Sequence, residues 1–397
     1  MYIAILGRQP ALGMAELERL YSTDTVRWFS DTAAIIGTDN FTIDHLGGTQ
    51  KAGRVVIDLP NADWRTASER IVRYYTKAWA NRPGKTTLGI STYGFNLSPR
   101  EVQKTGLTIK SQVKKTGVSL RLIPNTDTAL NTATSHHNKL GLSDNKVELL
   151  IARSRSGRVI VAESIGAQNI TAYAKRDQGR PKRDAFVGML PPKLAQMMLN
   201  MALADTNRPT DEAIDSAPRI LDPFCGTGVV LQEASLMGYR VYGTDLADKM
   251  IDYSEANLAW LETITRRPVN RTLHQGDATT TAWEPPVDAI VCESYLGQPF
   301  SAPPSPSKLE QVRGNCNHII SEFLTNIGSQ IEKGTPLCVA VPAWRDGNGD
   351  FHHLPLIKQL EKLGYTQVAL KNVKNEELLY FREDQIVARE LLILVKA

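Results

Sequence analysis

The stretch at 219–234, RILDPFCGTGVVLQEA, constrains the fold more than any other part of this chain. An apolar run ends at Asp222, a turn containing Gly226 and Gly228 follows, and a helical pattern of apolar residues begins directly after it. Strand, tight turn and helix in this order are typical of a doubly wound α/β sheet. The glycines let the backbone bend sharply and leave its N–H groups open to a ligand. The stretch therefore predicts a nucleotide-like cofactor across this turn.

Three acidic residues follow three successive predicted strands. Asp222 ends the first strand, Asp245 ends the second, and Asp277 ends the third or opens the loop beyond it. The carboxyl ends of parallel strands meet beside the crevice where ligands bind. There Asp222 can pair with an ammonium group, Asp245 can accept from both ribose hydroxyls, and Asp277 can accept from an adenine amine. An ammonium group favours S-adenosylmethionine, because a nicotinamide dinucleotide has none.

Two plainer interpretations of this stretch stay open. The third glycine of the dinucleotide fingerprint is absent, with Leu231 in its place, so the fold could serve another cofactor. Each acid taken alone could also do no more than cap the helix that follows it.

The series DPFCGTG, GTDL and GDATT, followed by a predicted strand at 287–292, resembles the class I S-adenosylmethionine-dependent methyltransferases. The resemblance implies a Rossmann-like catalytic domain that ends in an antiparallel hairpin. It also implies that S-adenosylmethionine is held by eight residues: Asp222, Phe224, Gly226, Gly228, Asp245, Leu246, Asp277 and Ala278.

Length and composition indicate a protein of several domains. The 397 residues exceed one usual domain and can form two or three, each with its own core. No apolar run reaches the roughly 18 residues of a membrane span, and we see no secretion signal at the N-terminus, so we expect a cytoplasmic protein. The four cysteines lack the close pairs that zinc needs, and no metal site is expected.

The charge of the chain is unevenly distributed. The formal net charge is +11 over residues 1–190 and −7 over residues 191–397. A basic half joined to an acidic catalytic half suggests that the first part binds a polyanion, because phosphate contacts supply most non-specific affinity for nucleic acids. A solvated basic surface without a ligand is the alternative.

The first 170 residues alternate between short predicted strands and helices. Strands are predicted at 2–6, 33–36, 54–59, 87–93, 119–123, 147–154 and 158–165, and helices at 14–21, 64–79 and 99–116. Residues 125–137 are predicted to be a polar loop. The aromatic residues of the second helix, Trp64, Tyr74, Tyr75 and Trp79, fit a core better than a base-stacking platform.

The order of elements after residue 60 resembles the THUMP RNA-binding module of tRNA-modifying enzymes. The phrase LGRQPALGMAELERLY near the N-terminus is similar to the opening of the tRNA guanine-N2 methyltransferases that act at position 10. This resemblance implies a ferredoxin-like domain at 1–60, a THUMP domain at 61–168, a linker with a helix at 169–217, and the α/β methyltransferase domain at 218–397. It also implies tRNA as the partner and S-adenosylmethionine as the cofactor.

The predicted linker combines a basic cluster with an apolar helix. Lys175, Arg176, Arg180 and Arg183 are the cluster, which we expect to bind the substrate RNA. The segment PPKLAQMMLNMAL follows, and its apolar residues recur at helical spacing. This stripe is expected to be core, and residues 204–217 are expected to be a polar connection.

The chemistry is expected at the turn after the fourth strand of the catalytic domain, ESYLG at 293–297. This turn resembles the D/N-P-P-Y/F turn that amino-group methyltransferases acting on bases carry after the same strand. In that turn the acid or amide and a backbone carbonyl accept hydrogens of the target amine, while the aromatic ring stacks on the base. This chain keeps an acid, Glu293, and a ring, Tyr295, as candidate catalytic residues. The acid is one methylene longer and both prolines are missing.

Three interpretations of that difference remain. Glu293 accepts the amine hydrogens with altered geometry, or the turn marks another target base, or the domain binds RNA and cofactor without efficient transfer. The predicted function is methylation of an exocyclic amine of tRNA, with guanine N2 at position 10 preferred. The alternatives are a DNA or rRNA amino-methyltransferase and a non-catalytic RNA-binding protein. The sequence does not determine whether a small activating subunit, as in some relatives, is required. It also leaves open whether the chain is a monomer or a homodimer.

Overall fold

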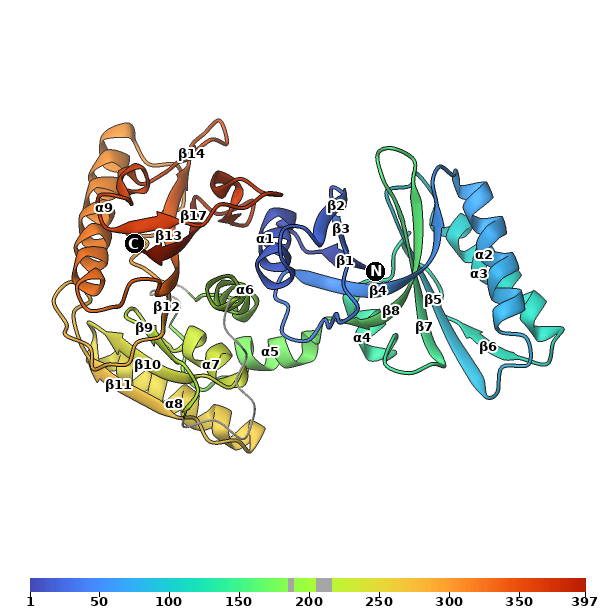
Figure 1. Cartoon of the computed structure of the whole chain (residues 1–397), viewed down its shortest axis with the longest axis horizontal. Coiled ribbons are helices and arrows are strands. Elements are labelled where there is room, and N and C mark those ends of the chain that lie inside the picture. The colour runs from blue at the N-terminus through green and yellow to red at the C-terminus, as the bar shows by residue number, and fades with distance from the viewer. Residues whose placement is uncertain (185–188, 205–215) are drawn as a thin grey trace. The chain divides into compact units, whose positions relative to one another are not determined.

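The computed structural model describes residues 1–184, 189–204 and 216–397. The chain forms two compact units, Met1–Ala172 and Tyr173–Ala397 (Figure 1). No helix among the described residues is long and apolar enough to span a membrane.

The first unit is built on one eight-stranded sheet with the order β2-β3-β1-β4-β8-β7-β5-β6. Its strands are β1 Tyr2–Leu6, β2 Val26–Ser30, β3 Ala33–Ile36, β4 Thr49–Leu59, β5 Lys85–Tyr93, β6 Ser119–Leu122, β7 Lys146–Arg153 and β8 Val159–Ala167. Its helices are α1 Pro10–Tyr21, α2 Trp64–Ala78, α3 Pro99–Lys114 and α4 Thr132–His137, and α5 Ile170–Gln178 continues into the second unit.

The long strand β4 joins the two predicted N-terminal domains in one sheet, because it pairs with β1 and with β8. The division of this unit at residue 60 stays a prediction.

Two elements of the first unit differ from the predicted ones. Strand β2 was not predicted, since its Arg27 and Trp28 are exposed and break the alternation of an edge strand. Helix α4 lies inside the expected loop, and the side chain of Asn131 caps it by accepting from Thr134 N at 2.7 Å.

Helices α2 and α3 pack on this sheet through a shared core (Figure 1). Tyr75 and Trp79 are 0% and 3% exposed and lie in that core, as predicted, and Trp64 packs against it partly buried. The same prediction is wrong for Tyr74, which is 38% exposed. Helix α3 begins with a capping box, in which Ser98 and Glu101 satisfy each other's backbone N–H groups. The basic residues of α3 therefore lie on a well-anchored helix.

The second unit is a sheet with the order β11-β10-β9-β12-β13-β17-β15. Its strands are β9 Arg219–Asp222, β10 Arg240–Asp245, β11 Arg271–Gln275, β12 Ala289–Glu293, β13 Pro336–Arg345, β14 Phe351–His352, β15 Tyr365–Gln367, β16 Leu379–Tyr380 and β17 Val387–Lys396. Its helices are α6 Pro192–Leu203, α7 Val229–Leu236, α8 Asp248–Thr265 and α9 Pro306–Gly328, with 3-10 turns η2 Pro355–Gln359 and η3 Asn375–Glu377.

Neighbours among β9 to β13 run parallel, whereas β17 runs antiparallel between β13 and β15. This order confirms the doubly wound sheet with a reversed terminal strand. The sequence pattern at 355–363 predicts a helix, but only the 3-10 turn η2 forms in that stretch.

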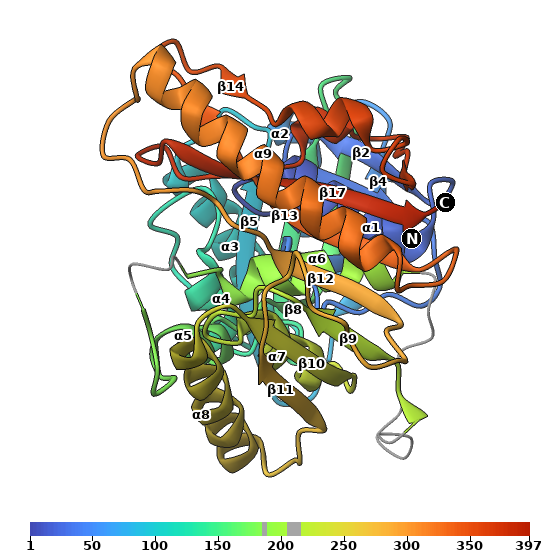
Figure 2. The same ribbon diagram turned by 90° about the vertical axis from the view of Figure 1, so that its left-hand side faces the viewer.

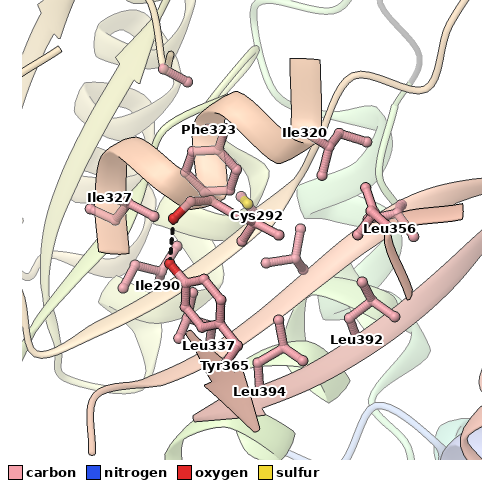
Figure 3. Close-up of a cluster of buried hydrophobic side chains, with 14 of the residues drawn as sticks. Ile290, Cys292, Ile320, Phe323, Ile327, Leu337, Leu356, Tyr365, Leu392 and Leu394 are labelled. Carbon is pink, nitrogen blue, oxygen red and sulfur yellow. Dashed lines mark hydrogen bonds between the residues drawn. The ribbon is translucent and has the colours of Figure 1, made fainter. Parts of the chain in front are cut away.

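Helix α9 covers the sheet that β13 and β17 extend (Figure 2). Its residues Ile320, Phe323 and Ile327 pack in one core cluster with side chains of β12, β13 and β17 (Figure 3). The hydroxyl of Tyr365 donates to Leu324 O at 2.6 Å across this cluster. The cluster fixes the distance between α9 and the strand ends that carry the acidic residues.

The predicted linker at 169–217 contains two helices. Helix α5 carries part of the basic cluster, and the apolar residues of α6 are buried, which confirms that its stripe is core. Residues 185–188 and most of the expected polar connection, 205–215, lie outside the described residues.

Candidate active site

The carboxyl ends of β9, β10 and β12 open into a cavity of about 780 Å³ within the second unit. Nine predicted site residues line it: Asp222, Phe224, Gly226, Asp245, Leu246, Asp277, Ala278, Glu293 and Tyr295. Gly228 lies directly behind them as the N-cap of α7. The structure therefore brings the predicted cofactor residues and the two candidate catalytic residues together.

The glycine turn adopts a backbone that only glycine takes easily. Gly226 and Gly228 have φ angles of 50° and 77°. A Cβ atom on Gly228 would lie 2.9 Å from Ser254 Oγ, which is too close for a real contact. This turn needs glycine both for its left-handed conformation and for its approach to α8.

Two buried side chains of α8 brace the same turn. Ser254 Oγ donates to Gly226 O at 2.9 Å, and Asn257 Nδ2 donates to Thr227 O at 2.8 Å. The sequence analysis missed both residues. The sequence predicts a helix at 249–260, and the spacing of three between these residues, on a face that also carries apolar residues, was the available signal. The brace fixes the turn's backbone beside the cavity.

Asp222 is a buried carboxyl group that lines the cavity. It is 2% exposed, and its Oδ1 accepts from Phe224 N at 3.1 Å. Burial raises the pKa of Asp222 well above its usual value, and the nearby carboxylates of Asp245 and Glu293 add to that rise. The structure therefore offers a cationic ligand a favourable partner here.

The other two predicted acids are held by backbone N–H groups. Asp245 accepts from Gly226 N at 2.9 Å and from Ala247 N at 3.0 Å. Asp277 Oδ1 accepts from the N–H and the hydroxyl of Thr279, and these bonds lower the pKa of Asp277. Each carboxylate oxygen has two lone pairs, so both acids can still accept from ribose hydroxyls or an amine.

Apolar groups border the same cavity. Leu246 is 68% exposed and Ala278 is buried, and both line it. Phe224 packs edge-on against Phe323 of α9, with ring centroids 5.1 Å apart. The cavity is therefore lined by apolar groups together with acidic side chains, a combination that suits a nucleoside.

The turn at 293–297 is fixed without prolines. Ser294 N and Ser294 Oγ both donate to Ala340 O at 2.9 Å. Gly297 has a φ of 79°, and a Cβ there would lie 2.9 Å from Val312 Cγ1 and 3.1 Å from Cys316 Sγ. Helix α9 and β13 therefore hold the turn in place, and Tyr295 remains 41% exposed at the cavity.

Sequence reasoning also missed the partner of Glu293. Arg389 on β17 donates from Nε to Glu293 Oε1 in an ion pair, with side chains that are 9% and 14% exposed. The charged pair Arg389-Glu390 directly before the apolar run LLILV, within one predicted strand, was the available signal that buried partners exist. His318 and Glu322 of α9 line the cavity as well, one helical turn apart.

The basic cluster of the linker divides into two pairs. Arg176 forms an ion pair with the buried Glu233 at 2.6 Å, and Arg180 is 3% exposed, where burial lowers its pKa. Lys175 and Arg183 are exposed. Binding of substrate by this cluster stays a prediction, and it rests on the exposed pair.

Comparison with known proteins agrees with this geometry. Residues 220–314 match the model of a methyltransferase domain. Over 172 residues the chain is 34% identical to the tRNA (guanine(10)-N2)-dimethyltransferase of Methanothermobacter thermautotrophicus. This match covers 43% of this chain and 44% of that protein. Over 71 residues it is 42% identical to the enzyme of the same name from Pyrococcus abyssi, and this match covers 18% of each protein. The matches thus span less than half of the length of these relatives.

The fold of the whole chain is similar to that of two solved structures. TrmN from Thermus thermophilus has a TM-score of 0.51 and 16% identity and covers 100% of this chain and 99% of its own. A possible methylase from Clostridium difficile 630 has a TM-score of 0.51 and 12% identity, and the match covers 98% of this chain and 97% of that one. The strand order and these likenesses show that the second unit has the class I methyltransferase fold, and residues 220–314 within it match the methyltransferase domain model.

Proposed function

We propose that this chain transfers a methyl group from S-adenosylmethionine to an exocyclic amine of tRNA, with guanine N2 at position 10 as the target. The buried carboxyl group of Asp222 in the lining of the cavity carries the proposal, because a cationic cofactor would stabilise the ionised form that burial disfavours. The similarity to proteins named tRNA (guanine(10)-N2)-dimethyltransferase supports the choice of tRNA and of guanine N2.

The residues of the cavity fit S-adenosylmethionine, which supplies an electrophilic methyl group on a sulfonium when it is bound. Asp222 would pair with the ammonium group, and Asp245 would accept from the ribose hydroxyls. Asp277 would accept from the adenine amine. The N–H groups of the glycine turn and the exposed face of Leu246 would complete the binding of the nucleoside.

Glu293 and Tyr295 would face the target base. An exocyclic amine is a poor nucleophile, since its lone pair is delocalised into the ring. Glu293 would accept a hydrogen bond from the amine and disperse the positive charge that develops on it, while Tyr295 would stack on the extruded base. Extrusion of the base costs a few kcal/mol, which phosphate contacts of the basic first half would offset.

The finer parts of the proposal concern the surroundings of the reaction. A THUMP domain in the first unit would bind the tRNA, and the reaction would take place in the cytoplasm. A small activating subunit would be a partner only if the purified chain binds tRNA and cofactor yet transfers slowly.

The decisive test is to incubate the purified chain with unmodified tRNA and S-adenosylmethionine, digest the RNA and identify its methylated nucleosides by mass. We expect N2-methylguanosine or N2,N2-dimethylguanosine, absent when the guanine at position 10 is replaced by adenine. Methylation of DNA or rRNA in preference to tRNA would contradict the proposal. Unchanged RNA mass despite binding would favour the non-catalytic alternative, once cell extract has been added to supply an activating subunit.

Neutralising Lys175 and Arg183 to glutamine is expected to weaken tRNA binding without harming the fold, because both side chains are exposed. If each contacts one phosphate, the slope of log affinity against log salt concentration falls by about 1.4 to 1.8. Filter binding at several salt concentrations measures it. Glutamine at the exposed Lys358 and Lys362 removes the same charge elsewhere on this unit and serves as the control. Equal slopes for the two double variants would exclude the cluster from the RNA interface.

A further inference from the structure

Arg389 contacts the candidate catalytic acid without lining the cavity. It lies on β17 opposite Pro342 of β13, and its Nε binds Oε1 of Glu293. Glu293 lines the cavity, whereas Arg389 is not among the described residues that do. The arginine therefore touches the acid but not the space in which cofactor and base would lie.

One oxygen of Glu293 remains for a ligand. The bond to Arg389 engages Oε1, and Oε2 has no hydrogen bond to another described residue. A guanidinium is planar and always charged, so a bond from it restricts the rotation of the carboxylate that it holds. This matters for a glutamate, which has one more rotatable bond than the aspartate or asparagine of the usual turn.

The ion pair also sets the distribution of charge in the cavity. Asp222, Asp245 and Glu293 all line it, and the charges of Asp245 and Glu293 add to the effect of burial in raising the pKa of Asp222. The positive charge of Arg389 offsets that of Glu293. A cationic ligand is therefore drawn to Asp222 rather than to Glu293, which leaves Glu293 for the target amine.

We propose that Arg389 is a positioning residue for the methyl transfer, which holds Glu293 so that its free oxygen can accept a hydrogen of the target amine. This inference rests on the proposed function. It explains how a longer acid, in a turn without the two prolines, keeps a defined geometry. The contact replaces the rigidity that proline would give with an ion pair from the reversed strand β17.

A double-mutant cycle on kcat tests the inference. We expect Arg389→Gln to lower kcat about 10- to 100-fold, since a misplacement of about 1 Å can cost a hundredfold. KM for tRNA and the affinity for S-adenosylhomocysteine should stay near the wild-type values. In a Glu293→Gln background the same substitution should change kcat little, because the group that it positions is already lost. Arg389→Lys should recover part of the rate by restoring the charge.

The controls separate positioning from folding. Arg271 also forms ion pairs within this unit, with Glu255 and Glu262, and does not line the cavity, so Arg271→Gln should leave kcat unchanged. If Arg389→Gln does not fold, Arg389→Lys replaces it in the cycle. Equal losses of kcat in the wild-type and Glu293→Gln backgrounds would overturn the inference. A wild-type chain that methylates no tRNA would instead contradict the proposed function.

Discussion

Replacing Glu293 with glutamine is expected to lower kcat for methyl transfer about 10²- to 10⁴-fold, the usual contribution of a positioned acid or base. Glutamine keeps the length of the side chain and one acceptor oxygen. It loses the negative charge that would stabilise the positive charge on the reacting amine. Because Arg389 holds Oε1, glutamine also exchanges an ion pair for a weaker hydrogen bond from the guanidinium to an uncharged amide oxygen.

Single-turnover transfer from labelled S-adenosylmethionine to tRNA measures this effect apart from product release. The affinity for S-adenosylhomocysteine should change little, since the acids proposed to hold the cofactor are untouched. Glu284→Gln removes an exposed carboxylate just before β12 and is the matched control. A rate for Glu293→Gln within a few-fold of wild type would show that the acid is not the acceptor, and would favour another target or another group in the turn.

Replacing Asp222 with asparagine is expected to weaken binding of S-adenosylmethionine by about 2 to 5 kcal/mol, the range for removing one partner of a buried charge pair. This corresponds to roughly 30- to several-thousand-fold in Kd. Asparagine can still accept from Phe224 N, so the turn should keep its shape. Methylthioadenosine has the nucleoside but no ammonium group, and its affinity should change far less. Isothermal titration with both ligands checks the contrast, and equal losses would show that Asp222 does not bind the ammonium group.

The same substitution should stabilise the ligand-free protein. Burial raises the pKa of Asp222 in the folded chain above the unfolded value of about 4. Below that value the carboxyl is protonated in both states and costs nothing. As pH rises above it, the unfolded chain ionises more readily, so Asp222 destabilises the fold increasingly until pH passes the folded pKa. The Tm of Asp222→Asn should therefore exceed that of wild type at pH 7 and approach it near pH 4. A constant difference across this range would contradict burial as the cause.

The chain's local patterns were sufficient to predict the cofactor half of the site. The glycine turn, the acids at the ends of β9 and β10, and the acid after β11 each depend on neighbours in the sequence. Because parallel strands bring their carboxyl ends to one edge, these local features were enough to predict one cavity. Glu293 at the end of β12 and Tyr295 just after it were located by the resemblance of ESYLG to the D/N-P-P-Y/F turn, and both line the same cavity.

Contacts between distant parts of the chain were decided only by the tertiary structure. Arg389 meets Glu293 across 96 residues because β17 inserts antiparallel beside β13, and no local pattern encodes which side chains such an insertion brings together. The bracing of the turn by α8 has the same origin. The pairing of Arg176 with the buried Glu233, which removes it from the exposed basic cluster, is also a tertiary contact, since Glu233 lies on a different helix. Periodicity and turn chemistry are local, whereas the pairing of buried charges depends on how the elements pack.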